Sequence, residues 1–216
     1  MVVAVDGPAG VGKSTVASRV AAITGFLYVN SGSFYRAISK AVLDSGVDPN
    51  DGPSVVQIAS RCRFSLRRGR LYLNGRPVDA LQTDLIDRWS PIHSSLPEVR
   101  RIVNENLRRI AASRNVIVEG RDMGTVAFPK AEVKIFLDAS LESRADRRYR
   151  QGVSALSPEL VRRGLEQRDS VDRSKPVGRL EMAEDAVYID SSHLTIEEVC
   201  ARVLAEIRKR QSTGRQ

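Results

Sequence analysis

The stretch that decides the fold of this 216-residue chain is Gly7-Pro8-Ala9-Gly10-Val11-Gly12-Lys13-Ser14-Thr15. It follows a pattern of one glycine, four residues, a second glycine, a lysine and a serine. A short apolar run, 1–5, precedes it, and residues 14–23 carry apolar side chains at helical spacing. The order of strand, glycine loop and helix predicts a loop whose backbone amides surround phosphate oxygens, helped by the positive end of the helix dipole.

The residue types at the end of this loop suit a nucleoside triphosphate. Lys13 can neutralise the outer phosphates, and the Ser14 hydroxyl can bind Mg²⁺. An ordinary tight turn between strand and helix would explain Gly7 but not the Lys13-Ser14 pair. We therefore expect residues 7–15 to bind ATP, with Lys13 also catalytic and Ser14 at the metal.

Apolar runs followed by helical patterns continue along the chain. Strands are predicted at 115–119, 134–138 and 186–190, and helices at 141–151 and 195–210. Because strands that alternate with helices form parallel sheets, the sequence predicts an α/β fold, the three-layer P-loop NTPase fold with a central parallel sheet.

The region 58–95 interrupts this alternation. Two short strands are predicted at 63–66 and 70–73, and Asn74-Gly75 is typical of a tight turn. Further on, Ser157-Pro158 predicts the start of a helix, and the polar stretch 151–154 before it is expected to be mobile. Residues 168–175 are expected to form a loop.

Composition limits the partners. The net charge is +8, but the basic residues are scattered and the aromatic residues are not interleaved with them, so small phosphorylated ligands are favoured over nucleic acid. Cys62 and Cys200 match no metal or disulfide spacing. No apolar run reaches signal-peptide or membrane-spanning length, so we expect a soluble, cytoplasmic protein without a membrane partner.

Two arginines are predicted at the carboxyl ends of strands, where open α/β sheets bind their ligands. Arg36 follows the apolar run 26–29, and Arg121 follows the strand at 115–119. A guanidinium can hold a phosphate through two hydrogen bonds, so the pair suits an acceptor that is already phosphorylated. The alternative is that both form surface salt bridges.

A second group of charges lies further along the chain. Arg144 and Arg148 are four residues apart on a predicted helix and share one face, which suits a lid over the transferred phosphoryl group or a solvated surface. Residues 168–175 could offer a carboxylate to a ribose hydroxyl and cations to phosphate.

At this level of detail the chain resembles the bacterial cytidylate kinases. The resemblance is carried by segments along nearly the whole sequence: 7–15, Ser31-Gly32 with Tyr35-Arg36, 97–100, 120–126, 134–140, Arg168-Asp169 with Asp172, and 183–186. The segment 120–126 and the cluster at 168–172 separate this family from adenylate and guanylate kinases.

The resemblance implies a molecule in three parts. The core is 1–57, 96–146 and 165–216, a small β-containing insert for the nucleoside monophosphate is 58–95, and a short helical lid is 147–164. It implies ATP with Mg²⁺ as donor, and CMP, with dCMP as a second acceptor. We expect a monomer.

The resemblance also assigns roles to individual residues. Arg100 and Asp122 would contact the cytosine edge, Arg36 and Arg121 with Ser31 would hold the acceptor phosphate, and Arg168 and Asp172 would contact the pentose. Lys175 would contribute to phosphate binding. From the residues themselves we expect Lys13, Mg²⁺, Arg144 and Arg148 to neutralise the developing charge.

Three positions depart from the family pattern. Asn30 stands where Asp is usual, Lys175 where Arg is usual, and Pro91 where a serine near the base is expected. A lysine is a point charge rather than a planar two-pronged group, so phosphate binding at Lys175 is expected to be weaker.

Two alternatives remain open. One is a P-loop kinase for shikimate, a nucleoside or uridylate, and the other is an NTPase stimulated by nucleic acid. An acceptor phosphate is already ionised at neutral pH, so no general base is needed, and His93 and His193 are expected to be structural or exposed.

Overall fold

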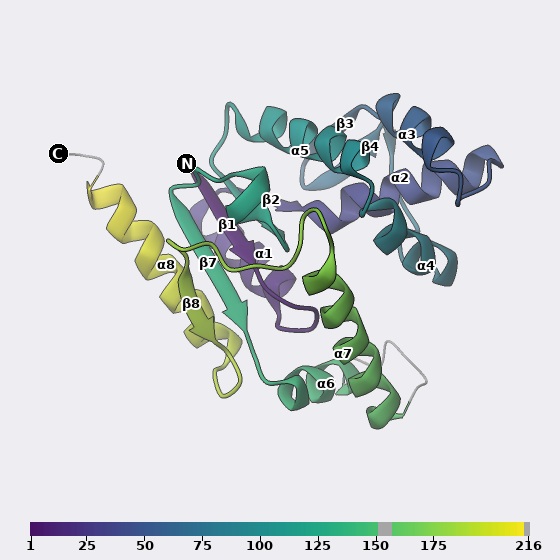
Figure 1. Cartoon of the computed structure of the whole chain (residues 1–216). Coiled ribbons are helices and arrows are strands. Elements are labelled where there is room, and N and C mark those ends of the chain that lie inside the picture. Colours follow the sequence, from purple (N-terminus) through teal and green to yellow (C-terminus); the bar gives the residue numbers. More distant parts are fainter. Residues whose placement is uncertain (151–156, 214–216) are drawn as a thin grey trace. The chain divides into compact units, whose positions relative to one another are not determined.

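The computed structural model describes residues 1–150 and 157–213, and the chain divides into two compact units (Figure 1). Unit 1 comprises residues 1–28, 115–175 and 179–216, and unit 2 comprises residues 29–114 and 176–178. Part of the predicted lid, including the stretch 151–154 that we expected to be mobile, lies outside the described residues.

The sheet of unit 1 is parallel at each pair of strands whose register is defined. Its strands are β1 (Val2–Asp6), β6 (Val116–Gly120), β7 (Val133–Asp138) and β8 (Val187–Asp190), and β2 (Leu27–Asn30), which continues into unit 2, completes the order β2-β6-β1-β7-β8. Val3 pairs with Ile117 on one side and with Val133 on the other. Nearly every residue of β1, β6 and β7 is buried, as continuous apolar runs require, whereas β8 at the edge of the sheet is mostly exposed. The predicted α/β fold with a central parallel sheet is confirmed.

Two helices pack on one face of this sheet. They are α1 (Lys13–Thr24) and α8 (Ile196–Thr213), at either end of unit 1 in sequence (Figure 1). Val16 and Val20 of α1 and Val203 of α8 join strand residues in one buried cluster. The cluster fixes α1 on the sheet, and α1 begins directly at Lys13.

The other two helices of unit 1 pack against each other. They are α6 (Leu141–Arg150) and α7 (Pro158–Ser174), and α7 begins as predicted because the Ser157 side chain accepts a hydrogen bond from the Leu160 amide. The expected loop at 168–175 is wrong. The buried positions Val161 and Leu165 continue at helical spacing into Asp169 and Asp172, so α7 extends through the charged cluster.

Unit 2 combines four helices with a small antiparallel sheet. The helices are α2 (Ser31–Ser45), α3 (Gly52–Ser60), α4 (Asp84–His93) and α5 (Pro97–Ala111), and the strands are β3 (Phe64–Arg67), β4 (Arg70–Leu73) and β5 (Arg76–Pro77). The predicted strands and the Asn74-Gly75 turn are confirmed, and both turn residues have positive φ, 49° and 81°. The two-residue strand β5 was not predicted.

Buried side chains hold the helices of unit 2 together. Phe34 of α2 packs on Phe64 of β3, with ring centroids 4.8 Å apart. His93 is fully buried, and its ring nitrogens hydrogen-bond Ser39 at 2.9 Å and the Pro49 carbonyl at 3.0 Å. Burial lowers the pKa of His93, so the ring is neutral and structural. His193 is exposed.

The two cysteines are buried free thiols, one in each unit. Burial raises the pKa of Cys62 to about 11 and also raises the pKa of Cys200, so both stay protonated at neutral pH. Among the helices of the described ranges, none combines the length and apolar character needed to cross a membrane.

Candidate active site

The glycine loop of unit 1 is shaped by close contact with the sheet. Gly7 has φ +147°, and a Cβ at this position would lie 1.9 Å from the Leu137 carbonyl oxygen of β7. Only glycine fits so near this strand. The loop then turns into α1, and the buried Lys13 ammonium donates to the Pro8 carbonyl at 2.5 Å. The loop is therefore closed by its own lysine.

Lys13 is buried among charges of both signs. Its pKa is lowered well below the usual value, first by burial and then by the nearby Arg121 and Arg168, against the opposing effect of Glu119 and Asp6. An anion bound near Lys13 would relieve this unfavourable charge. The electrostatics of the loop thus favour a ligand with several negative charges, such as a polyphosphate.

Arg121, Asp172 and Lys175 form one ion cluster in unit 1. Arg121 follows β6 and donates through Nε to Asp172 of α7 at 2.8 Å, while the Lys175 ammonium donates to the other Asp172 oxygen at 2.9 Å. Burial alone would raise the pKa of Asp172, but the two cations outweigh it and lower the pKa to about 2. The structure thus brings together three residues predicted for the acceptor site.

Arg144 is buried behind the glycine loop. Its guanidinium forms an ion pair with the buried Asp169 of α7 and donates to the Ala139 carbonyl at 3.0 Å and the Ala9 carbonyl at 3.2 Å. Arg148, one turn later on α6, is exposed. Both residues lie on α6 as predicted, but they differ in burial, because Asp169 provides a buried partner at Arg144.

Two further predicted site residues of unit 1 differ in burial. Asp122 directly follows Arg121 and is buried. Arg168 is exposed on α7, one residue before Asp169, and lies near enough to Lys13 to lower its pKa. Unit 1 thus contains the whole loop and every predicted site residue from Arg121 onward.

Unit 2 contains the remaining three predicted site residues, Ser31, Arg36 and Arg100. Ser31 is buried at the start of α2. Arg36, one turn later, donates to the Leu81 carbonyl at 2.9 Å and pairs with Asp87 of α4 at 2.6 Å. These contacts fix the direction of the Arg36 side chain within unit 2.

Arg100 is enclosed by backbone and an aromatic ring. Its guanidinium carbon lies 5.4 Å from the centre of the Tyr35 ring, and Nη1 donates to the Ser94 carbonyl at 3.0 Å. A Cβ on Gly178 would lie 1.9 Å from the same guanidinium carbon. Arg100 is therefore held in one orientation, which suits recognition of a planar group by hydrogen bonds.

Comparison with known proteins assigns the family. The cytidylate kinase family model matches residues 3–209. The chain belongs to this family. It is 40% identical over 212 residues to a cytidylate kinase of Caldanaerobacter subterraneus, covering 96% of this chain and 94% of the relative. It is 39% identical over 221 residues to a cytidylate kinase of Solibacter usitatus, covering 100% of this chain and 95% of the relative.

A solved structure supports the fold independently. The shikimate kinase of Bacteroides thetaiotaomicron superposes with a TM-score of 0.52 at 10% identity, covering 96% of this chain and 98% of that chain. At this identity the likeness concerns the fold alone. The predicted family resemblance and enzyme class, a nucleoside monophosphate kinase, are confirmed by the family match.

The structure explains the departure from the family pattern at Asn30 and shows what the departure at Pro91 removes. Asn30 caps α2, because its side-chain oxygen accepts from the Ser33 amide at 3.1 Å, and an amide oxygen can do this as well as a carboxylate. Pro91 lies inside α4 and has no side-chain donor or acceptor. Any polar contact expected from a serine there must come from another residue.

Sequence reasoning missed two buried carboxylates of unit 1. Asp6, at the end of β1, accepts from the Met123 and Gly124 amides at 2.8 and 2.7 Å and so fixes the single π-helical turn Met123–Ala127. Burial raises the pKa of Asp6 to about 6, although both amides oppose the shift. Asp169 was missed as the partner of Arg144. The only signal in the sequence was the position of Asp6 immediately before the loop.

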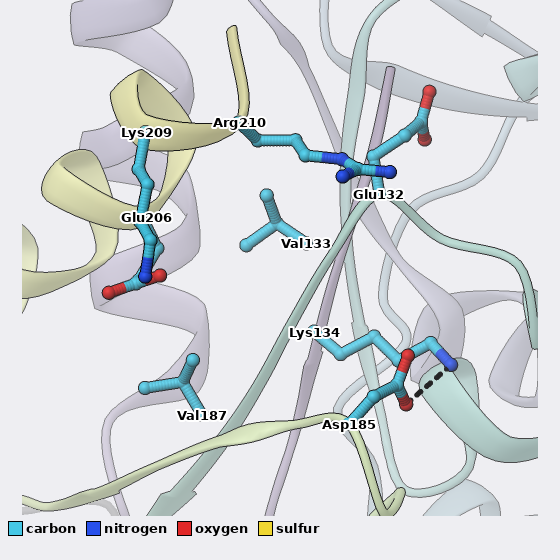
Figure 2. A pocket seen from close by; sticks show the side chains of 8 residues that line it. All are labelled: Glu132, Val133, Lys134, Asp185, Val187, Glu206, Lys209 and Arg210. Atoms are coloured by element: carbon cyan, nitrogen blue, oxygen red, sulfur yellow. Dashed lines mark hydrogen bonds and ion pairs between the residues drawn. The ribbon is translucent and has the colours of Figure 1, made fainter. Parts of the chain in front are cut away.

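A separate cavity of about 170 Å³ lies elsewhere in unit 1. It is lined by two valines, three acidic and three basic residues: Glu132, Val133, Lys134, Asp185, Val187, Glu206, Lys209 and Arg210 (Figure 2). Lys134 donates to Asp185 at 2.8 Å across it. Because it borders the first residue of β7 and the loop follows the last residue of the parallel β1, the cavity lies at the opposite end of the sheet. It is not part of the candidate active site.

Proposed function

We propose that this chain transfers the γ-phosphoryl group of ATP to CMP, and also to dCMP, to give ADP and CDP or dCDP. The observation that carries the proposal is the buried Lys13, whose pKa is depressed by burial and by neighbouring cations in a loop of the phosphate-binding pattern. Phosphates bound beside Lys13 would add the negative charge that stabilises a buried ammonium group. The family match over residues 3–209 supports the cytidine acceptor.

In this proposal residues 7–15 bind the triphosphate of ATP, and Lys13 neutralises its outer phosphates. The Ser14 hydroxyl would hold Mg²⁺, a hard cation that prefers oxygen ligands. Ser14 fits this role because it is exposed at the start of α1 and its hydroxyl bonds no residue that the structure describes. When bound, Mg²⁺ supplies charge neutralisation across the outer phosphates.

The acceptor would be held by its phosphate, sugar and base. We assign the phosphate to Arg36, Arg121 and Lys175, with Ser31 beside it, the pentose to Arg168 and Asp172, and the base edge to Arg100 and Asp122. The ion cluster supports the assignment, since Asp172 keeps Arg121 and Lys175 together and in fixed directions. Cations ordered in advance lose less entropy when a phosphate binds.

The reaction needs alignment and charge neutralisation more than proton transfer. A phosphate oxygen of the acceptor attacks the γ-phosphorus, the bond to ADP breaks, and Lys13, Arg144 and Arg148 neutralise the developing charge. Arg148 is exposed, so a bound phosphate could contact it without uncovering a buried group. Arg144 would have to break its ion pair with Asp169 to contact a phosphate. If it keeps that pair, it stabilises the loop through its hydrogen bond to the Ala9 carbonyl.

The remaining features of the proposal concern organisation. We propose the division into core, insert (58–95) and lid (147–164), and a monomeric enzyme that acts in the cytoplasm without nucleic-acid or membrane partners. A single size-exclusion peak at the monomer mass, unchanged by added RNA at low salt, is the expected result.

A product assay tests the central reaction. Purified protein with ATP, Mg²⁺ and CMP is expected to form CDP and ADP in equal amounts, measured by ion-exchange chromatography. EDTA should stop the reaction, and cytidine, which lacks the acceptor phosphate, should not replace CMP. Faster transfer to cytidine or to shikimate than to CMP would refute the proposed acceptor.

A further inference from the structure

Helix α5 of unit 2 carries two buried asparagines that differ in their hydrogen bonds. Asn106 donates to the Ile102 carbonyl at 2.8 Å and accepts from Arg109 at 2.8 Å. Asn104 is 5% exposed, and its Oδ1 has no hydrogen-bond partner among the residues that the structure describes. A buried acceptor without a donor is costly, so this amide requires an explanation.

The unbonded oxygen lies on the face of α5 that carries Arg100. Residues four apart share one face of a helix, and helical side chains lean toward the N-terminus, so Asn104 leans toward Arg100. Arg100 itself is fixed by the Tyr35 ring, the Ser94 carbonyl and the backbone of Gly178. Asn104 is therefore a second polar group beside the guanidinium that we assigned to the base edge.

The hydrogen-bonding edge of cytosine calls for such a pair. This edge presents two acceptors, O2 and N3, and one donor group, the 4-amino group. Arginine has donors only and can satisfy the two acceptors, but it cannot accept from the amino group. The Asn104 oxygen supplies an acceptor for the amino group on the same face of the same helix as Arg100.

We propose that Asn104 is a specificity-determining residue whose Oδ1 accepts a hydrogen bond from the exocyclic amine of the bound pyrimidine. The inference rests on the proposed function and extends it to a residue outside the assigned site. It also accounts for Pro91, because Asn104 provides from α5 a polar contact that Pro91 of α4 cannot provide. Uracil carries a carbonyl in place of the amine, so the same oxygen opposes it.

Two substitutions at Asn104 and one at Asn106 test the inference. Asn104→Leu keeps the branching of the side chain and removes the acceptor, so the KM for CMP should rise about tenfold, the loss of one buried hydrogen bond, with kcat little changed. The KM for UMP should change much less, so the preference for CMP falls. The melting temperature of Asn104→Leu should stay equal or rise, because an unsatisfied buried group is removed.

Asn104→Asp keeps an acceptor and loses the amide donor. It should retain CMP as substrate and raise the preference for CMP over UMP, since the side chain can no longer turn to donate to uracil. Asn106→Leu is the matched control on the same helix. It should lower the melting temperature, because satisfied bonds are lost, while the ratio of kcat/KM for CMP and UMP stays that of the wild type.

The outcomes separate this inference from the proposed function. If the wild type makes no CDP from CMP, the function itself fails. If the wild type is active but Asn104→Leu keeps the wild-type CMP to UMP ratio, Asn104 is satisfied by a buried water or is structural, and the inference is overturned. The aspartate variant decides the question if the leucine variant does not fold, because loss of CMP preference in that variant would also overturn it.

Discussion

Three predicted site cations of unit 1 and Arg100 of unit 2 are held by different partners. In unit 1, Arg121 and Lys175 are bound to Asp172, and Arg144 is bound to Asp169. In unit 2, Arg100 is held by a carbonyl, an aromatic ring and the close backbone of Gly178. Carboxylate oxygens resemble phosphate oxygens in charge and geometry, whereas a ring and a carbonyl fix orientation. We infer that the cations of unit 1 are held by charge, whereas Arg100 of unit 2 is held in direction. Arg36 of unit 2 pairs with Asp87 and so resembles the cations of unit 1.

The largest effect is expected at Lys13 of unit 1. Lys13→Ala should lower kcat about 10³-fold, because the main neutralising charge of the loop is lost. The fold should persist, which circular dichroism can check. Lys40→Ala is the control: this side chain is on the surface of α2 in an i,i+4 pair with Asp44, and its loss should leave kcat unchanged.

The next largest effect is expected on the free energy of unfolding, at the buried ion pair of Arg144 and Asp169. Asp169→Ala leaves the buried Arg144 guanidinium without its carboxylate, which should lower the free energy of unfolding by about 3–5 kcal/mol. Urea denaturation measures this loss. Asp146→Ala removes an exposed pair with Arg150 on α6 and should cost less than about 1 kcal/mol. Equal losses in the two variants would contradict a special role of the buried pair.

Asp172 should make the stability of unit 1 depend on pH. Its pKa is lowered to about 2 because Arg121 and Lys175 outweigh burial, so the stabilisation is present above the unfolded value near 3.8 and is lost as the pH falls through about 2. Asp172→Asn should lower the unfolding free energy by about 2 kcal/mol at pH 7, and the difference from wild type should vanish toward pH 2.

A surface carboxylate provides the comparison for this titration. Asp79→Asn removes an exposed pair with Arg70 and should change the unfolding free energy by less than about 1 kcal/mol at either pH. A difference between wild type and Asp172→Asn that persists unchanged at pH 2 would show that the ion cluster is not its source.

The smallest effect is expected in unit 2. Gly178→Ala would put a Cβ 1.9 Å from the Arg100 guanidinium carbon, so Arg100 must move and the KM for CMP should rise roughly tenfold. Gly46→Ala has a similar backbone strain, with φ +74° against +65°, but no atom within 4 Å of the new Cβ. It should lower the free energy of unfolding through backbone strain alone, without changing KM. Equal KM values for CMP in Gly178→Ala and Gly46→Ala would contradict a role of Arg100 in base recognition.

Much of the fold could be predicted because its signals are local. The loop at 7–15 and the apolar runs of β6 and β7 are continuous in sequence, and burial on both faces of a parallel sheet demands such runs. The charged segment 168–175 was misassigned because the carboxylates of α7 are buried only through partners far along the chain. The other charged residues of this segment on α7, Arg168 and Arg173, are exposed.

The candidate site was predictable only in part for the same reason. Arg121 and Asp172 were singled out separately, but their contact spans 51 positions and depends on the packing of α7 in unit 1. The burial of Arg144 depends on Asp169, 25 residues away. Neither the contact between Arg121 and Asp172 nor the burial of Arg144 can be read from helical spacing alone. Asn104 gave no signal in sequence, because an amide on a helix is ordinary until its burial and missing donor are known.

A single assay addresses most directly the claim that the cations of unit 1 serve charge and that Arg100 of unit 2 is directed at a base. Initial rates with ATP, Mg²⁺ and CMP, dCMP, UMP or AMP, measured side by side, give kcat/KM for acceptors that share a phosphate and differ in base or sugar. The account predicts CMP first, dCMP next, UMP lower and AMP lowest. Equal kcat/KM for CMP and AMP would contradict it, because the phosphate alone would then decide the acceptor and Arg100 would recognise no base.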